Sequence, residues 1–171
     1  MNEVIKNLLE RRSIRKFIDK EISKEDLDLI LKAGTFAPTA SGKQSPTMVV
    51  INGNDLNELE KINAEIYGKN DHPFYGAKLA ILVLGDATNK NTIYDGSLVM
   101  GNLMNAAHSL GIGSCWIHRA KETFEREDGK KFLKKWGLSG EYTGIGYCIL
   151  GYADSDSPKP AERKENYVIF A

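Results

Sequence analysis

Segments with apolar residues at helical spacing alternate along this chain with short apolar runs typical of strands, and this alternation limits the folds that the chain can adopt. Apolar residues at helical spacing predict helices over 4–12, 23–34, 55–66, 95–110 and 122–136. Short apolar or β-branched runs predict strands over 47–52, 76–84, 111–118 and 144–152, with a short terminal strand over 167–170. Strands separated by helices predict a layered α+β or α/β domain. With 171 residues, 42% of them hydrophobic, residues 1–171 can form one domain with its own core.

Several helix boundaries carry local signals. Ser23 precedes two acidic residues and reads as an N-cap with a negative first turn. Asp95 is expected to cap the next long helix, and Gly111 to close it. Over 122–136 the acidic residues come first and the lysines last, which complements a helix dipole. We therefore interpret its KKFLKKW run as a solvated helix end and not as a nucleic-acid patch.

Charge and cysteine usage exclude several classes of protein. Lys and Arg number 23, Asp and Glu also 23, so no global positive field recruits nucleic acid or an anionic membrane. Cys115 and Cys148 lie in apolar runs without metal spacing and are expected to be small buried hydrophobes. The N-terminus does not resemble a signal peptide, and the run Leu79–Leu84 is too short to span a bilayer. These features predict a soluble, cytoplasmic protein.

The common nucleotide and catalytic motifs are incomplete. Residues 37–44 imitate a P-loop but lack its first glycine and its magnesium-binding hydroxyl. The Gly-Ile-Gly sequences at 111–113 and 144–146 lack the third glycine of a dinucleotide fingerprint. The three histidines stand alone, and no nucleophile, base and oxyanion hole assemble. If the chain is an enzyme, a cofactor is expected to supply the chemistry.

The most informative cluster is Arg11-Arg12-Ser13-Ile14-Arg15. Three guanidinium groups and a hydroxyl beside a helix terminus form a local anion clamp suited to phosphate. The nearby loop Pro38–Gln44 offers backbone amides, hydroxyls and a carboxamide without bulky side chains. Such a loop can lie against a flat heteroaromatic ring.

Four segments, in this order, resemble the nitroreductase family of FMN-dependent oxidoreductases. They are RRSIRKF at 11–17, APTASGKQSP at 37–46, DGSLVMGNLMNAAHSLGIGSCWIH at 95–118 and YCILGYA at 147–153. The resemblance implies an α+β fold with a mostly antiparallel sheet flanked by helices, in an intertwined homodimer with FMN at the interface. Residues 154–171 would then be a C-terminal extension that wraps the partner subunit.

The resemblance also implies an activity. NAD(P)H would reduce the flavin, and a nitroaromatic, quinone or similar acceptor would then take two electrons in a ping-pong cycle. Two alternatives stay open at this point: another flavin chemistry on the same fold, such as reductive dehalogenation or flavin destruction, and an FMN-binding carrier without efficient turnover.

Residue roles follow from the same resemblance. Arg11 and Ser13, with Arg12 between them, would contact the phosphate and ribityl end, and Arg15 the N1 and O2 edge of the ring. The loop residues that would approach from the other subunit are Pro38, Thr39 and Ala40, with Gln44 in the same loop. The stretch that would line the ring is Trp116, Ile117, His118 and Arg119, and Arg163 would reach the phosphate.

The chain departs from the family pattern in the loop. Gly42 stands where the family usually has asparagine, and Ser45 intervenes between Gln44 and Pro46. The connection between Asp86 and Asp95 is short, where larger members insert helices. The shorter connection implies a more open pocket.

Overall fold

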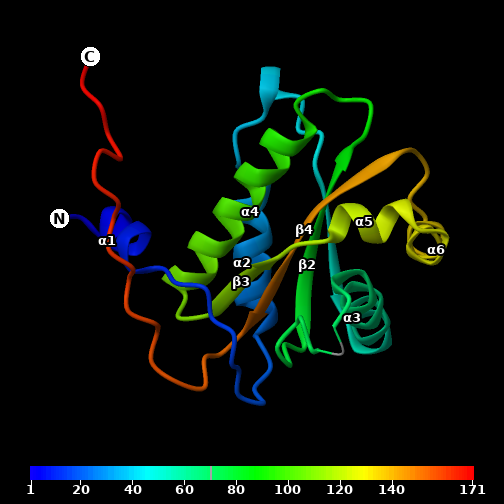
Figure 1. The fold of residues 1–171 in the computed structure, drawn as a ribbon, viewed down its shortest axis with the longest axis horizontal. Helices are drawn as coiled ribbons and strands as arrows, with labels where there is room; N and C mark the ends of the chain where they lie inside the picture. The colour runs from blue at the N-terminus through cyan, green and yellow to red at the C-terminus, as the bar shows by residue number, and fades with distance from the viewer. Residues whose placement is uncertain (70) are drawn as a thin grey trace.

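A four-stranded antiparallel sheet lies between two layers of helices in the computed structural model, which describes residues 1–69 and 71–171 (Figure 1). The strands are β1 (Thr47–Asn52), β2 (Leu79–Asp86), β3 (Gly113–Ile117) and β4 (Tyr142–Gly151). Their spatial order is β1-β2-β4-β3, and each neighbouring pair is antiparallel. The predicted α+β class is confirmed.

Helices cover both faces of this sheet. Helices α2 (Lys24–Thr35) and α4 (Thr92–Ser109) pack on one face, and α3 (Gly53–Tyr67), α5 (Ala120–Glu125) and α6 (Glu127–Lys135) on the other (Figure 1). Along β2, Leu82 and Leu84 join the core beneath α3, whereas Ile81 and Val83 join the core beneath α4. Because both faces are buried, this strand is apolar from Leu79 to Leu84 and does not alternate with polar residues.

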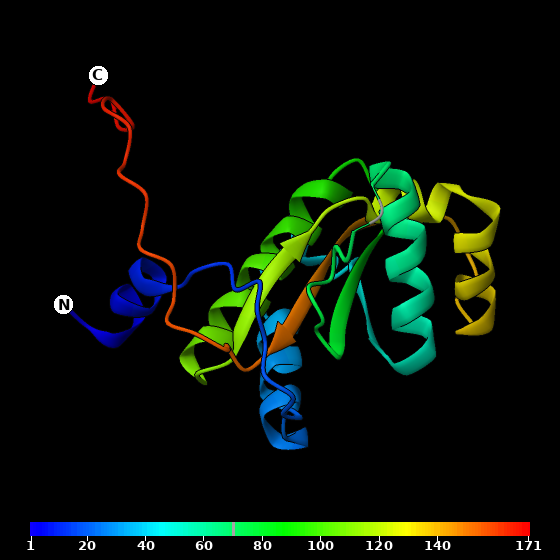
Figure 2. The same ribbon diagram turned by 60° about the horizontal axis from the view of Figure 1, so that its bottom comes forward.

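The N-terminal segment covers the outer edge of β3. Helix α1 (Glu3–Glu10) has no buried residue, and the chain then runs beside β3 toward the end of β4 (Figure 2). Ser13 forms an isolated parallel bridge with Ser114, in which the Ile14 amide donates to the Ser114 carbonyl at 2.9 Å. An edge covered in this way is closed to further strand pairing.

Several local predictions are confirmed. Strand β1 has the predicted bounds, and the Ser23 hydroxyl accepts from the Asp26 amide at the start of α2. Gly111 follows α4 with φ +71°, and the Ile112 amide donates back to Ala107, which is a glycine-terminated helix end. Both cysteines are buried free thiols, and burial raises the pKa of Cys148 to about 12.

The expected capping role of Asp95 is wrong. Helix α4 begins three residues earlier, at Thr92, whose hydroxyl donates to the Asp86 carbonyl at 2.6 Å. Asp95 therefore lies inside the first turn, and its carboxylate is directed at a different segment, described below.

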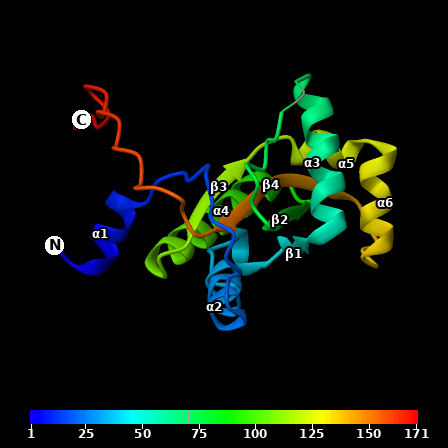
Figure 3. The same ribbon diagram turned by 90° about the horizontal axis from the view of Figure 1, so that it is seen from below.

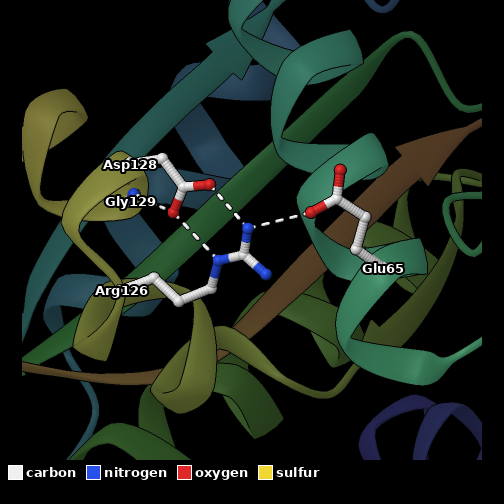
Figure 4. Close-up of polar contacts among 4 residues, drawn as sticks. All are labelled: Glu65, Arg126, Asp128 and Gly129. Carbon is white, nitrogen blue, oxygen red and sulfur yellow. Dashed lines mark hydrogen bonds and ion pairs between the residues drawn. The ribbon is translucent and has the colours of Figure 1, made fainter.

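The single helix predicted over 122–136 is also wrong, since the chain forms two helices that meet at an extended Arg126. The Arg126 guanidinium donates twice to Asp128, at 2.9 and 2.7 Å, and once to Glu65 of α3, at 2.8 Å (Figure 4). Gly129 then packs so closely on the Thr123 carbonyl that a Cβ would overlap it. These contacts turn α6 back against α5 and α3.

The terminal strand predicted over 167–170 is not formed. The chain beyond Ala153 has no helix or strand, and Tyr167, Val168, Ile169 and Phe170 are exposed. The β3 edge of the sheet is instead covered by the N-terminal segment. This tail extends from the body at the same end of the molecule as α1 (Figure 3). No helix within the described residues is both long and apolar enough to cross a bilayer.

Candidate functional site

The arginine cluster starts where α1 ends. The Arg11 amide closes the helix by donating to Asn7, and Arg12 Nη1 donates to the carbonyl oxygens of Leu9 and Arg11 at 2.7 Å. Carbonyl groups at a helix C-terminus carry partial negative charge, so a cation there is stabilised. Arg12 therefore uses its Nη1 to bond carbonyl groups at the C-terminal end of α1.

Other polar atoms of this cluster lack partners. Arg11 Nη1, Arg12 Nε and Ser114 Oγ are buried and accept or donate no hydrogen bond within the part of the chain that the structure describes. A buried donor without a partner costs about 1–3 kcal/mol. Guanidinium nitrogens pair with phosphate oxygens, and the bridge to Ser114 sets the Ser13 backbone beside them. The residues present thus fit a bound phosphate group.

The positive charge of the cluster extends to α4. The Asn7 side chain donates to the Asn105 carbonyl at 3.0 Å, which fixes α1 against α4 near its C-terminal end. Burial, followed by the charge of Arg11, lowers the pKa of His108 one turn further along. Both effects favour the neutral form of the His108 imidazole.

Arg15 makes a contact with the segment that precedes β2. Its side chain is exposed, and its guanidinium carbon is 5.9 Å from the ring centre of Tyr75, within the range of a cation–π contact. Tyr75 itself has φ +53°.

The stretch 116–119 begins at the end of β3. The Trp116 indole crosses Gly146 of β4, where a Cβ would overlap it, and its Nε1 is buried without a partner among the described residues. Ile117 is buried beneath the opposite helical layer. His118 is exposed, with its ring 5.9 Å from that of Trp116.

Arg119 makes a strained turn that Asn63 holds. It has φ +72°, a left-handed conformation that costs a non-glycine residue free energy. The fully buried Asn63 donates to the His118 carbonyl at 2.8 Å and accepts from Arg119 Nε at 2.9 Å. The Arg119 guanidinium also lies 4.4 Å from the Tyr67 ring centre. The Arg119 side chain is thus directed at α3, and its backbone is fixed in the turn.

The sequence reasoning missed Asn63. The available signal was a polar residue adjoining the apolar stripe of Leu59, Ile62 and Ile66.

The 36–46 loop carries the remaining predicted residues. Pro38 and Gln44 are exposed, and the Thr39 hydroxyl accepts from the Gln44 amide at 3.0 Å. The Ala40 amide donates to the Asp95 carboxylate at 2.9 Å, so the loop is fixed at the N-terminal end of α4.

Within one chain the structure does not bring this loop to the arginine cluster. The loop meets α4 at Asp95, and α1 meets it at Asn105. Those positions are about 15 Å apart along the helix, at a rise of ~1.5 Å per residue. Arg163 lies in the exposed tail, where its guanidinium donates to the Ala161 carbonyl.

The fold and these residues define a class of protein that the comparisons identify. The nitroreductase family model matches residues 8–79 and 65–152, and the chain belongs to this family. An Archaeoglobus fulgidus protein with the provisional name NADH dehydrogenase/NAD(P)H nitroreductase is 31% identical, over 98% of this chain and 91% of that protein. A Bacillus subtilis protein named FMN reductase (NAD(P)H) is 31% identical, over 94% of this chain and 70% of its own length.

A solved structure shows the same architecture. The nitroreductase with bound FMN from Bacteroides fragilis superposes with a TM-score of 0.90 at 26% identity, and each chain is covered in full.

Proposed function

We propose that this protein is an FMN-dependent oxidoreductase that uses NAD(P)H to reduce nitroaromatic compounds, quinones or similar acceptors. The observation that carries the proposal is the pair of buried guanidinium nitrogens on Arg11 and Arg12 that have no partner among the described residues, next to the Ser13 bridge to Ser114 in the chain. Similar nitroreductases have been solved with bound FMN, and a similar protein is named an FMN reductase. When bound, FMN would accept two electrons from NAD(P)H and release them to the acceptor in a second half-reaction, a ping-pong cycle.

The phosphate end is assigned to Arg11, Ser13 and Arg163. Arg11 supplies a buried donor without a partner, and Ser13 lies on the segment that bridges to β3. Arg163 would come from the tail of the partner subunit, since its side chain is exposed and its two hydrogen bonds go to a carbonyl two residues away. Each charge-assisted contact to phosphate is worth about 1.5–3 kcal/mol.

The ring end is assigned to Arg15 and the stretch from Trp116 to Arg119. Arg15 would stabilise negative charge at the N1 and O2 edge and so make reduction more favourable. Because Asn63 fixes the turn at Arg119, the backbone of this stretch would present its amides in one orientation. The Trp116 indole N–H, buried without a partner among the described residues, is a further donor on this strand.

A homodimer is proposed because the two halves of the site lie apart in one chain. The Pro38–Ala40 loop meets α4 at Asp95, and α1, which leads into the Arg11 cluster, meets it at Asn105, ten positions or about 15 Å away. An antiparallel partner would bring the loop of one chain to the cluster of the other. Exposed apolar side chains on α1, on α4 and in the tail offer surface for this association: Val4, Leu8, Leu9, Ile93, Tyr94, Leu98, Ile169 and Phe170.

Residues 1–171 would then form one FMN-binding domain whose segment 154–171 wraps the partner. The tail buries none of its large apolar side chains against its own chain, which a partner surface would change.

The test is a spectrum followed by turnover. The purified protein is expected to show flavin absorbance after FMN is added and unbound FMN removed, to bleach on anaerobic addition of NADH or NADPH, and to recover its colour with a quinone. Double-reciprocal plots of the initial rate against NAD(P)H concentration, at several fixed quinone concentrations, should give parallel lines if the mechanism is ping-pong. A protein that holds no FMN would refute the proposal, and one that binds FMN but bleaches only slowly would be a carrier.

A further inference from the structure

We propose that Asp95, with Asn89 and Ser45, positions the 36–46 loop for flavin binding. This inference rests on the proposed function, because it concerns the affinity of the same FMN site. Asp95 touches no cofactor in this account and acts through the loop.

Asp95, Asn89, Ser45 and the Ala40 amide form what we call the loop clamp, which consists of one buried carboxylate and three hydrogen-bond donors. Asp95 is 2% exposed, and its Oδ1 accepts from the Ala40 amide at 2.9 Å. Its Oδ2 accepts from Ser45 Oγ and from Asn89 Nδ2, both at 3.3 Å. Asn89 Nδ2 also donates to Ser45 Oγ at 2.8 Å. One side chain of α4 thus holds the loop at two points, and Asn89 joins it to the connection that follows β2.

The loop conformation needs support from outside. Ser41, Gly42 and Gln44 have φ of +56°, +64° and +51°, and the two non-glycine residues are strained there. The hydrogen bonds inside the loop run from the amides of Gly42, Lys43 and Gln44 to Thr39 and Ala40. All of residues 41–44 are exposed. Few buried contacts and strained backbone are the properties of a segment that opens locally.

The buried charge also indicates a role beyond packing. Within the described residues no lysine or arginine bonds to the Asp95 carboxylate, so its charge is offset by the α4 N-terminus and by the three donors. Burying a carboxylate is costly, and an apolar residue of similar size would fill this position at lower cost. An apolar residue could not accept a hydrogen bond from the Ala40 amide, and so it could not fix the direction of the loop.

The clamp also explains a departure from the family pattern. Ser45 is the residue that intervenes between Gln44 and Pro46, and its hydroxyl contacts both Asp95 and Asn89. The additional residue is therefore anchored to α4 and does not lengthen a free loop.

Asp95→Asn tests the clamp with almost no change in shape. Whichever way the amide is turned, its NH₂ group faces either the Ala40 amide or the Asn89 amide, which are both donors. Ser45→Ala removes the hydroxyl contacts to Asp95 and Asn89 at a half-exposed position, where misfolding is not expected. The matched controls are Asp28→Asn, on the exposed face of α2, and Ser109→Ala, whose hydroxyl bonds within its own helix.

The first readout needs no flavin. Trypsin cuts after Lys43 in the loop, and the cut after Lys164 in the tail serves as an internal reference. Proteolysis of a segment that opens locally follows the population of its open form. In the full-length, FMN-free protein, Asp95→Asn should raise the relative rate after Lys43 about tenfold, or ~1.4 kcal/mol. Ser45→Ala should raise it about threefold, or roughly 0.7 kcal/mol, and the controls should leave it unchanged.

The second readout is the FMN dissociation constant, measured by quenching of flavin fluorescence, together with visible circular dichroism of the bound flavin. Asp95→Asn should raise the constant about tenfold and alter the dichroism. Substitution of a residue that only stabilises the fold would change neither the dissociation constant nor the dichroism.

The outcomes are distinct. Unchanged cleavage after Lys43 would show that no clamp exists. Faster cleavage with unchanged FMN affinity and dichroism would show a clamp that does not position the flavin site, which also overturns the inference. A wild-type protein that binds no FMN would refute the proposed function and this inference with it. If the wild type binds FMN and the variants bind it with the same affinity, this inference alone is refuted.

Discussion

Replacing Arg11 with methionine should weaken FMN binding without destabilising the FMN-free protein. Arg11 is half-buried, and its Nη1 has no hydrogen-bond partner among the described residues. Methionine keeps the apolar stem of the side chain and removes the charge. The two effects of the substitution should therefore have opposite signs.

The magnitudes follow from the hydrogen-bond inventory. An unsatisfied buried donor costs about 1–3 kcal/mol, so the free energy of unfolding of FMN-free Arg11→Met should stay constant or rise by up to that amount. Loss of one charge-assisted phosphate contact, about 1.5–3 kcal/mol, should raise the FMN dissociation constant about 10- to 150-fold.

The assay combines urea unfolding of the FMN-free protein with FMN titration by fluorescence. Arg126→Met is the matched control, because the Arg126 guanidinium bonds to Asp128 and Glu65 through Nε and Nη2 (Figure 4). That variant should lower the stability of the FMN-free protein and leave FMN affinity unchanged. An Arg11→Met protein with wild-type FMN affinity, or one destabilised as much as Arg126→Met, would show that Arg11 is not an unpaired donor reserved for the phosphate.

Three further outcomes are expected. Arg15→Ala should lower the flavin midpoint potential. Two charges ~4 Å apart at an effective dielectric constant of ~20 interact by about 4 kcal/mol, an upper limit of roughly 90 mV for two electrons. Because Arg15 is exposed, screening keeps the shift below that limit, and a redox titration that shows no fall would contradict its role. Asn63→Ala should lower the free energy of unfolding by about 2–4 kcal/mol, because it leaves the His118 carbonyl and Arg119 without their partner; a urea midpoint equal to wild type would contradict this. Because burial and the Arg11 charge lower the pKa of His108 below 6.5, the unfolded chain takes up that proton first, and this group reduces stability as pH falls below about 6.5. An NMR titration should place the His108 midpoint below 6.5 and show it rise in Arg11→Met; a midpoint that stays in place would show that Arg11 does not act on it.

Elements with local signals were predictable from the sequence. Strand β1 has β-branched residues between Pro46 and Gly53, and both of its ends were correct. Helix α2 begins at a serine cap, and α4 ends at a glycine with positive φ. In each case the deciding interaction lies within a few residues.

The predictions that were wrong concern elements whose structure depends on residues far away in the sequence. The break at Arg126 involves Glu65, 61 positions away. The Asp95 carboxylate meets Ala40, 55 positions away, and the sequence pattern favoured a cap instead. The N-terminal segment, and not the predicted 167–170 strand, covers the sheet edge at β3.

The candidate site was predictable in part. The arginine cluster and the 36–46 loop were recognised as sequence motifs. Their placement at opposite ends of α4 is a consequence of packing and could not be read from the chain.

In the proposed dimer, residues of two chains hold each flavin, and complementation between two defective variants tests this arrangement. Arg11→Met weakens the cluster, and Ala40→Glu places a carboxylate in the loop; each variant alone should bind FMN weakly. If the cluster and the loop belong to different subunits, a heterodimer has one site with both defects and one intact site. Co-expression in equal amounts should then restore about one quarter of the tight FMN sites, since about half of randomly paired dimers are mixed. If both groups belong to one chain, every site carries a defect, and a mixture that recovers no tight FMN binding would contradict the account.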